Sequence, residues 1–334
     1  MLKERGDKPF FIVLSGPTAS GKTSFSVELA KRLPVEIING DMGQLYEPLS
    51  IGTAKPKPGE YPCPTHLFDF LKEPVSFSSA SFRREVERCM RDIVKRGNVP
   101  VVVGGSLFYL KSLFFVSPAV ESGERASYSA FSIEELREQL ALIDPERAVA
   151  IHPGDRYRLE RALALWERHR VKPSALRPVF SPLGTFVFVF LTRERADLYR
   201  RIGERCESMI QEGLLDEVRD LPLEWSAFLR KKGLIGYTEI LDYLEGEISL
   251  KQAADKMAQL TRNYAKRQLT FWRMLQRKLT DSGASAWGSW WEANLTLSPV
   301  DLYLEQVLLQ TKILKDGVEV SDEKPKRGED DNVF

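Results

Sequence analysis

A glycine-rich octapeptide near the amino terminus restricts the fold of this chain more than any other feature. Residues 16–23 read Gly-Pro-Thr-Ala-Ser-Gly-Lys-Thr, after the apolar run 10–14 and before the amphipathic stretch 24–33. A strand, such a loop and a helix form a phosphate-binding P-loop, in which backbone N–H groups and the helix N-terminus hold an anion. Lys22 adds a positive charge, and the Thr23 hydroxyl is placed to reach a Mg²⁺ ion. The segment predicts a phosphate site in an α/β protein.

Composition limits the classes that this chain can belong to. Its 334 residues suit one large α/β domain with an insertion or a second small domain. The net charge of +1 means that any nucleic-acid contact comes from local patches and not from a global field. Three widely spaced cysteines without a CxxC pair argue against a zinc site and a disulfide framework. With no signal peptide and no bilayer-spanning run, we expect a cytoplasmic protein without membrane contact.

Apolar segments alternate with helical ones in the first hundred residues. The expected strands are residues 12–14, 35–39 and 99–103, with a helix over 77–95 between the last two. Continuous β-branched runs are typical of parallel strands that are buried on both faces. Ligands of such sheets bind at the carboxyl ends of the strands. The P-loop, Asp41 and residues 104–106 all follow a strand, so we expect them to meet in one cleft.

The pattern divides the chain into four parts. From about residue 118 capped helices replace the strands, and the buried run GTFVFVFL at 184–191 then restores the sheet. A long helix is expected over 249–279, and the sequence after Lys315 is charged and poor in apolar residues. The predicted organisation is a P-loop NTPase-like parallel sheet core over 1–117, a helical insertion domain over 118–180, a resumed and mostly helical core over 181–314, and a disordered tail over 315–334.

Two residues after the second strand carry candidate chemistry. The strand 99–103 ends in Gly104-Gly105-Ser106 and not in the acid that holds Mg²⁺ in many NTP-hydrolysing P-loop proteins. Asp41 is therefore either that acid or a general base. Gln44 has an amide that can pair with the N6 and N7 edge of adenine, although such a residue is often solvated. Lys55, in a loop bracketed by Gly and Pro, is either a phosphate contact or a solvated lysine.

Basic residues gather in two stretches. The stretch 156–172 mixes arginines with acids, which is typical of a salt-bridged exposed helix. The stretch 256–278 contains no acid and interleaves Tyr264, Phe271 and Trp272. On helical spacing Arg262, Lys266 and Arg273 can share a face. This pattern suits RNA, whose phosphates pair with Arg and Lys and whose bases stack on aromatics, and it equally suits a core helix with a solvated edge.

Taken together, these segments resemble the tRNA dimethylallyltransferases, also called tRNA isopentenyltransferases. The resemblance runs from Phe10 to Arg273. It rests on the P-loop and on these further segments: Asp41-x-x-Gln44-x-Tyr46, Ile51-Gly52-Thr53-Ala54-Lys55-Pro56, His66-Leu67, Val102-Val103-Gly104-Gly105, Ile151-His152-Pro153-x-Asp155, Arg158-x-x-Arg161-Ala162-Leu163, Gly213 to Val218, Ile235-Gly236-Tyr237 and Thr261 to Gln268.

The resemblance implies transfer of a dimethylallyl group from dimethylallyl diphosphate to N6 of adenosine 37 in tRNA, next to the anticodon. It implies Mg²⁺ as cofactor, tRNA as partner through its anticodon stem-loop, and no ATP hydrolysis; we expect a monomer. The implied catalytic residues are Asp41 as general base, Ser106 and Thr23, with Thr23 also reaching Mg²⁺ through the diphosphate. The implied diphosphate-binding residues are Gly16, Pro17, Thr18, Ala19, Ser20, Gly21, Lys22, Thr23, Arg262 and Lys266. The implied tRNA-binding residues are Asp41, Met42, Gly43, Gln44, Lys55, Ser106, Tyr157, Arg158, Arg161, Lys266, Arg267, Gln268 and Arg273.

The chain departs from the family pattern at a few positions. Met42 stands where the family usually has Ser, Leu107 replaces a Gly, and the basic residues that often flank the Ile-Gly-Tyr segment are Gly233 and Thr238 here. The changes at Met42 and Leu107 leave open a tRNA-binding protein that has lost its activity. The P-loop and the arginine-rich insertion leave open a small-molecule P-loop kinase, and an enzyme that prenylates free adenine nucleotides is the third alternative.

Overall fold

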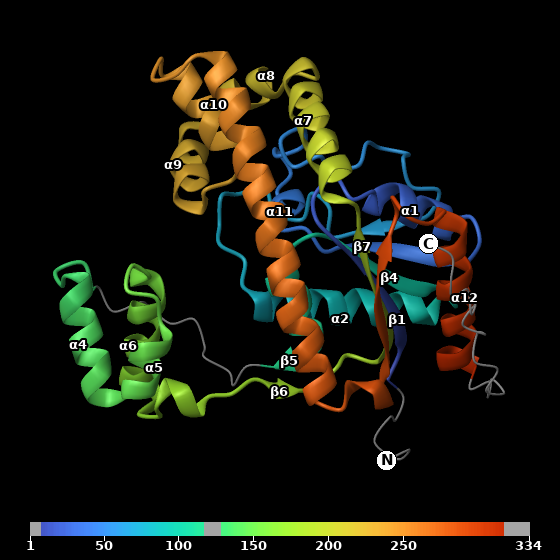
Figure 1. Ribbon diagram of the computed structural model, residues 1–334, viewed down its shortest axis with the longest axis horizontal. Coiled ribbons are helices and arrows are strands. Elements are labelled where there is room, and N and C mark those ends of the chain that lie inside the picture. Colours follow the sequence, from blue (N-terminus) through green and yellow to red (C-terminus); the bar gives the residue numbers. More distant parts are fainter. Residues whose placement is uncertain (1–7, 117–127, 317–334) are drawn as a thin grey trace, which may run out of the picture. The chain divides into compact units, whose positions relative to one another are not determined.

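The computed structural model describes residues 8–116 and 128–316 (Figure 1). Its internal contacts divide the chain into two compact units, residues 1–111 with 182–334 and residues 112–181. Of the insertion predicted over 118–180, residues 128–180 lie in the second unit, and residues 118–127 lie outside the described residues. In the described part of the chain, no helix has the length and apolar character that crossing a bilayer requires.

A six-stranded sheet forms the centre of the larger unit. Its strand order is β3-β2-β4-β1-β7-β8, and each neighbouring pair is parallel. The strands are β1 (Phe10–Ser15), β2 (Val35–Asn39), β3 (Thr65–His66), β4 (Val99–Val103), β7 (Thr185–Thr192) and β8 (Gly288–Asn294). The predicted fold class, α/β with a parallel core, is confirmed.

Helices cover both faces of the sheet because alternate side chains of each strand point to opposite sides. On one face Ile12 and Val187 join a core with residues of α1 (Lys22–Ala30) and α12 (Val300–Asp316). On the other face Phe188 and Phe190 contact Trp272 of α11 (Leu250–Asp281). The helices α2 (Ser79–Lys95) and α11 both contact the short helix α3 (Leu107–Leu110). Burial on both faces explains the continuous apolar runs of the strands.

Four shorter helices follow β7 and gather at the carboxyl end of the sheet, from which α11 runs across one face (Figure 1). They are α7 (Arg195–Gln211), α8 (Leu214–Arg219), α9 (Leu223–Lys232) and α10 (Tyr237–Leu244). Together with the start of α11 they share a second apolar core that includes Leu214, Trp225 and Tyr237. This group of helices positions one side of the site described below.

The second unit is a small helical body. It contains α4 (Ile133–Ile143), α5 (Pro145–Ala150), α6 (Arg156–His169) and a two-stranded antiparallel pair, β5 (Phe115–Val116) with β6 (Val179–Phe180). Ser132 caps α4 in a reciprocal capping box with Glu135, as its sequence pattern predicts. Leu136, Leu140 and Leu159 form its core.

Three elements near the carboxyl end were not predicted. They are the strand β8, which contains Trp290 and Trp291, and the helices α9 and α12. The helix α12 extends to Asp316, so residues 315 and 316 are helical and the predicted tail begins too early. The rest of that tail lies outside the described residues.

Candidate active site

The carboxyl ends of β1, β2 and β4 meet around Gly105. A Cβ atom built at Gly105 would lie 2.6 Å from Nε2 of Gln268, 3.5 Å from Oδ2 of Asp41 and 3.6 Å from the carbonyl oxygen of Gly16. A side chain does not fit there, so the glycine permits the close approach. The P-loop, Asp41 and the 104–106 segment thus lie together at one edge of the sheet, with α11 beside them.

The P-loop ends in an uncapped helix terminus. Gly21 precedes α1 with a φ of +102°, a left-handed conformation that glycine adopts without strain, and no side chain caps the helix. The first N–H groups of a helix have no intrahelical partner, so they are available to an anion. The buried hydroxyl of Ser20 also has no hydrogen-bond partner among the described residues. Several donors in this loop are therefore left for a ligand.

Lys22 lies across the same loop. Its Nζ donates to the carbonyl oxygens of Gly16 at 3.1 Å and Pro17 at 2.9 Å. Burial lowers the pKa of Lys22 to about 8; the nearby Asp41 carboxylate raises this pKa and the Arg205 guanidinium lowers it further. An anionic ligand would favour the charged form of Lys22, so ligand binding and protonation of this side chain are coupled.

This coupling predicts a pH dependence of diphosphate affinity. Below pH 8 Lys22 is charged before the ligand arrives; above pH 8 the free protein must first take up a proton, so affinity should fall about tenfold per pH unit. Titration calorimetry with dimethylallyl diphosphate from pH 7.5 to 9.5 measures this slope, in a range where the ligand's own phosphate, with a second pKa of about 6, is ionised.

Two variants control that measurement. Lys22→Met should bind more weakly and with no slope above pH 8. Lys31→Met, which removes an exposed lysine of the same segment paired with Glu28, should keep the slope. A slope that survives in Lys22→Met would show that another group titrates.

Side chains from distant segments hold the outer side of the P-loop. Oε1 of Gln268 accepts from the N–H of Thr18 at 3.1 Å, and its Nε2 donates to the Gly105 carbonyl at 2.8 Å. Nε of Arg201 donates to the Ala19 carbonyl at 3.0 Å, and Nε of Arg193 to the Ser20 carbonyl at 2.9 Å. Gln268 was expected to bind tRNA, but its amide is buried and committed to backbone atoms at both ends. It braces the loop instead.

Asp41 is fixed through its backbone and its carboxylate. The fully buried Asn39 accepts from the Asp41 N–H at 2.8 Å and donates to the Asp41 carbonyl at 3.0 Å. One carboxylate oxygen of Asp41 accepts from the Gly43 N–H at 3.2 Å. Next to it, the Ser106 hydroxyl accepts from the Met42 N–H at 3.1 Å. Met42, which stands where the family usually has Ser, is therefore hydrogen-bonded in the site through its backbone. Its side chain makes none of these contacts.

Arg205 is a site residue that our sequence analysis missed. It lies on α7, where burial lowers its pKa and the Asp41 charge raises it. The Arg205 charge in turn lowers the pKa of Lys22. Arg205 makes no hydrogen bond or ion pair with any described residue. Arg201 and Arg205 are spaced i,i+4 on a helix that follows a strand of the sheet, so their position at the carboxyl edge was a usable signal.

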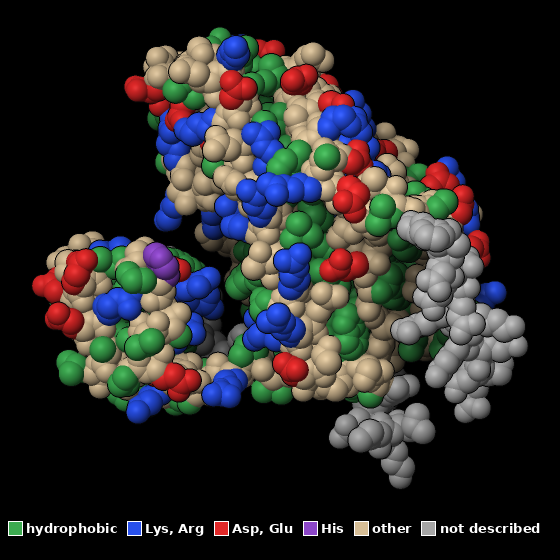
Figure 2. Space-filling view, in the orientation of Figure 1, with side chains coloured by type: hydrophobic (Ala, Val, Ile, Leu, Met, Phe, Trp, Pro, Cys, Tyr) green, Lys and Arg blue, Asp and Glu red, His purple; other side chains and the backbone are tan. Residues whose placement is uncertain are grey.

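The cations of α11 divide into site and surface residues. Figure 2 shows Lys and Arg side chains along this helix, where Lys266, Arg267 and Arg273 are exposed and Arg262 is half-buried. The Arg267 guanidinium lies over the Tyr264 ring at 5.7 Å. Trp272, which the sequence offered as a stacking aromatic, is fully buried, stacks on Phe190 and donates to Glu292. It is a core residue, which agrees with the second of the two alternatives for this stretch, a core helix with a solvated edge.

Two predicted tRNA contacts are engaged within the protein. Nζ of Lys55 donates to the carbonyls of Tyr46 at 2.8 Å and Glu47 at 3.1 Å and pairs with Asp69, and its side chain is only 6% exposed. This lysine anchors its own loop and is not a free phosphate contact. The amide nitrogen of Gln44 donates to the carbonyls of Thr53 and Ala54, each at 3.1 Å. Only its oxygen is left for a base, so the expected two-bond reading of adenine does not fit.

The insertion unit presents its predicted residues on α6. Tyr157 and Arg161 are exposed and spaced i,i+4, which places them on one face of the helix. Arg158 is also exposed and pairs with Asp155 at 3.2 Å, while Arg156 pairs with Glu160. The salt-bridged exposed helix that the mixed charges indicated is present.

A metal ion has few protein ligands in this site. In the part of the chain that the structure describes, no three His, Cys, Asp or Glu side chains cluster as metal ligands. The Thr23 side chain lies near the Tyr61 hydroxyl, which accepts from the Ser26 hydroxyl at 3.2 Å. Mg²⁺ often binds through one or two protein oxygens together with substrate phosphates. Thr23 and a bound diphosphate fit that pattern, whereas an all-protein metal site does not.

The sheet is parallel, its first strand–helix junction forms an anion cradle, and a carboxylate follows β2, which β4 separates from β1. This arrangement defines an α/β enzyme of P-loop NTPase-like fold. The model of the IPP transferase family matches residues 44–275, and that of the isopentenyl transferases matches residues 10–74. The chain belongs to the IPP transferase family, and it is a prenyltransferase.

Individual relatives agree with this assignment. A tRNA dimethylallyltransferase of Citrifermentans bemidjiense is 40% identical over 278 residues, which cover 81% of this chain and 91% of the relative. One of Geobacillus thermodenitrificans is 39% identical, with coverages of 78% and 87%. Among solved structures, a tRNA isopentenylpyrophosphate transferase from Staphylococcus epidermidis has a TM-score of 0.60 at 30% identity, covering 91% of this chain and 99% of its own. A eukaryotic dimethylallyltransferase acting on tRNA has a TM-score of 0.77 at 25% identity, covering 94% and 81%.

Proposed function

We propose that this protein transfers the dimethylallyl group of dimethylallyl diphosphate to N6 of adenosine 37 in tRNA. One observation carries the proposal: the uncapped P-loop helix, Lys22 and Arg205 supply positive potential beside the carboxylate of Asp41. An anion cradle next to a proton acceptor suits a reaction in which a diphosphate leaves and an amine attacks. The relatives that carry the name tRNA dimethylallyltransferase support it.

The leaving group is handled by the P-loop side. The bond between the first carbon of the dimethylallyl group and the diphosphate oxygen breaks, and its electron pair stays with the diphosphate. Donors fixed in place before the reaction stabilise that growing charge most effectively. We assign this role to the loop amides, Lys22 and Arg205, with Arg262 and Lys266 of α11 as further cations.

The attacking group is handled by the Asp41 side. The new bond joins N6 to the same carbon, and the proton that N6 loses passes to the Asp41 carboxylate. The hydroxyl of Ser106 and the backbone of Met42 and Gly43 border that carboxylate. Gln44 would contribute its amide oxygen, which can accept from an exocyclic amine such as N6 of adenine.

Mg²⁺ would be held mainly by the diphosphate, with Thr23 as a protein ligand. When bound, the ion would help to neutralise the charge on the leaving group.

RNA would bind to exposed cations. Lys266, Arg267 and Arg273 line one helix and are free to pair with phosphates, and Tyr157, Arg158 and Arg161 would contact the anticodon arm from the insertion unit. The target adenine would have to leave its stack, at a cost of a few kcal/mol.

A single assay tests the function. Purified protein, dimethylallyl diphosphate, Mg²⁺ and an anticodon stem-loop with adenosine 37 should yield prenylated adenosine, detected by mass spectrometry, with one diphosphate released for each product. Parallel reactions with AMP and with ATP alone distinguish the open alternatives. Prenylated AMP without prenylated RNA would identify an enzyme of free nucleotides, and steady ATP turnover would identify a kinase.

A further inference from the structure

The turn next to Asp41, on the side of the site where the acceptor adenine would bind, packs against a second loop. The 3₁₀ turn Gly43–Leu45 follows Asp41, and its Gly43 N–H donates to the Asp41 carboxylate at 3.2 Å. Thr53 packs so closely on this turn that a Cβ atom at Gly43 would lie 2.8 Å from its methyl carbon. The Gln44 amide is tied to the carbonyls of the same loop. The loop over residues 50–54 therefore sets where this turn lies.

A carboxylate from α8 holds that loop. Oε2 of Glu217 accepts from the N–H groups of Ser50 at 3.1 Å and Ile51 at 2.7 Å, and Oε1 accepts from that of Gly52 at 3.2 Å. The Tyr237 hydroxyl donates to the same Oε1 at 2.6 Å. Four donors thus converge on one ionised group, and hydrogen bonds to a charged acceptor are about twice as strong as neutral ones.

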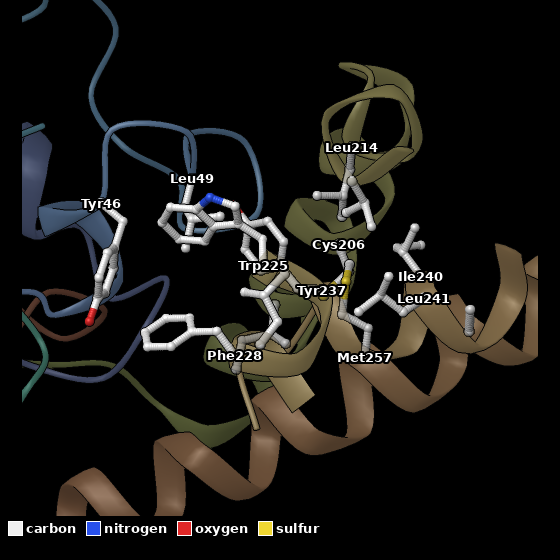
Figure 3. Close-up of a cluster of buried hydrophobic side chains, with 14 of the residues drawn as sticks. Tyr46, Leu49, Cys206, Leu214, Trp225, Phe228, Tyr237, Ile240, Leu241 and Met257 are labelled. Atoms are coloured by element: carbon white, nitrogen blue, oxygen red, sulfur yellow. The ribbon is translucent and has the colours of Figure 1, made fainter. Parts of the chain in front are cut away.

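The Tyr237 side chain that donates to Glu217 belongs to a buried apolar core. Tyr237 is fully buried among apolar side chains that include Leu214 and Met257, as Figure 3 shows. A Cβ atom at Gly52 would lie 2.5 Å from the Tyr237 ring, so the loop backbone lies directly on it. Burial and the Glu217 charge both raise the pKa of Tyr237, which keeps its hydroxyl a donor. The packing of Tyr237 in this core therefore fixes the position of the 50–54 loop, whose backbone lies against its ring.

We propose that Glu217 and Tyr237 are positioning residues that hold Asp41 and Gln44 at the place where the acceptor base is attacked. The proposal rests on the assignment of Asp41 as general base. Neither residue hydrogen-bonds to a described residue of the P-loop, whose backbone is held by Gln268, Arg193 and Arg201. Different sets of hydrogen bonds therefore hold the diphosphate side and the base side of the site.

Glu217→Gln tests this division. The amide replaces an acceptor oxygen by a donor that faces backbone N–H groups, so the 50–54 loop should shift. A displacement of about 1 Å can cost roughly a hundredfold in rate, and we expect kcat to fall by about tenfold to a hundredfold while the Kd for dimethylallyl diphosphate changes less than about twofold. Tyr237→Phe, which removes one hydroxyl and keeps the ring packed, should show the same split with a smaller loss.

A double-mutant cycle separates positioning from general stability. If Glu217 acts through Asp41 and Gln44, Glu217→Gln should lower kcat by a clearly smaller factor in the Asp41→Asn protein than in the parent protein, so that the two losses do not add. Asp242→Asn is the matched control, because it breaks the ion pairs with Arg230 and Lys256 in the same group of helices without touching the 50–54 loop. It should leave kcat unchanged even where it lowers Tm.

The outcomes are distinct. Losses that add in the cycle, or a parallel loss of donor affinity and kcat in Glu217→Gln, would overturn the positioning role. If Glu217→Gln does not fold, Tyr237→Phe decides: unchanged kcat overturns the proposal. If Asp41→Asn alone retains full activity, the general-base assignment fails and the proposal with it.

Discussion

Asp41→Asn is expected to lower kcat by about 10²- to 10⁴-fold, the usual contribution of a positioned general base. The amide keeps the shape of the carboxylate and an oxygen that can accept from the Gly43 N–H, so the loss reports the missing base and not a collapsed turn. Single-turnover prenylation of an anticodon stem-loop measures the chemical step directly.

Donor binding provides the internal control for this variant. The Asp41 charge raises the pKa of Lys22, so its removal should bring that pKa below about 8. Affinity for dimethylallyl diphosphate must therefore be compared near pH 6.5, where Lys22 is charged in both proteins, and there it should be nearly equal. Asp92→Asn, which removes an exposed carboxylate of α2 paired with Lys95, should behave as the parent protein. Full activity in Asp41→Asn would assign the proton to another acceptor.

Arg205→Gln is the second large effect, with an expected loss in kcat of about 10²- to 10³-fold, as for the removal of one preorganised donor from a developing anion. Arg205 has no ion pair with a described residue and lies within electrostatic range of Lys22 and Asp41. An arginine in that setting is available to neutralise a leaving diphosphate.

A second readout distinguishes this role from a structural one. Because the Arg205 charge lowers the pKa of Lys22, its removal should move the fall of donor affinity to a pH above 8. Arg200→Gln is the matched control on the same helix, where Arg200 is exposed and paired with Asp197 and Glu204. An unchanged rate in Arg205→Gln would exclude this residue from the leaving-group site.

The local elements of this protein could be predicted where their signal is contained in a short segment. The P-loop, the buried strands and the capped start of α4 each depend on neighbouring residues, and each appears where the sequence places it. The strand β8 was missed because its glycine and tryptophans lack the apolar run of the other strands. Its place beside β7 is decided by pairing with a strand about a hundred residues earlier.

The site shows the same limit more sharply. Lys55, Gln44 and Gln268 are polar residues in motifs, and their sequence context does not say whether their hydrogen bonds go to a ligand or to the protein. In the structure the hydrogen bonds of Lys55 and Gln268 go to backbone carbonyls and amides. The amide nitrogen of Gln44 is likewise bonded to backbone carbonyls, and its oxygen is left. Arg205 shows the opposite case, because an arginine in an ordinary amphipathic helix becomes a site residue once α7 is placed.

The sequence by itself determined which functional groups are present: an anion-binding loop, a carboxylate after the next strand in the chain and a basic helix. Each of these depends on residue types at short spacing. Only the tertiary structure decided which polar groups are left for substrates. That choice depends on contacts between segments far apart in the chain, such as Glu217 with the 50–52 amides and Gln268 with Thr18 and Gly105. Hydrogen-bonding groups that are satisfied within the fold brace the site, and those that the fold leaves without a partner are the ones able to bind.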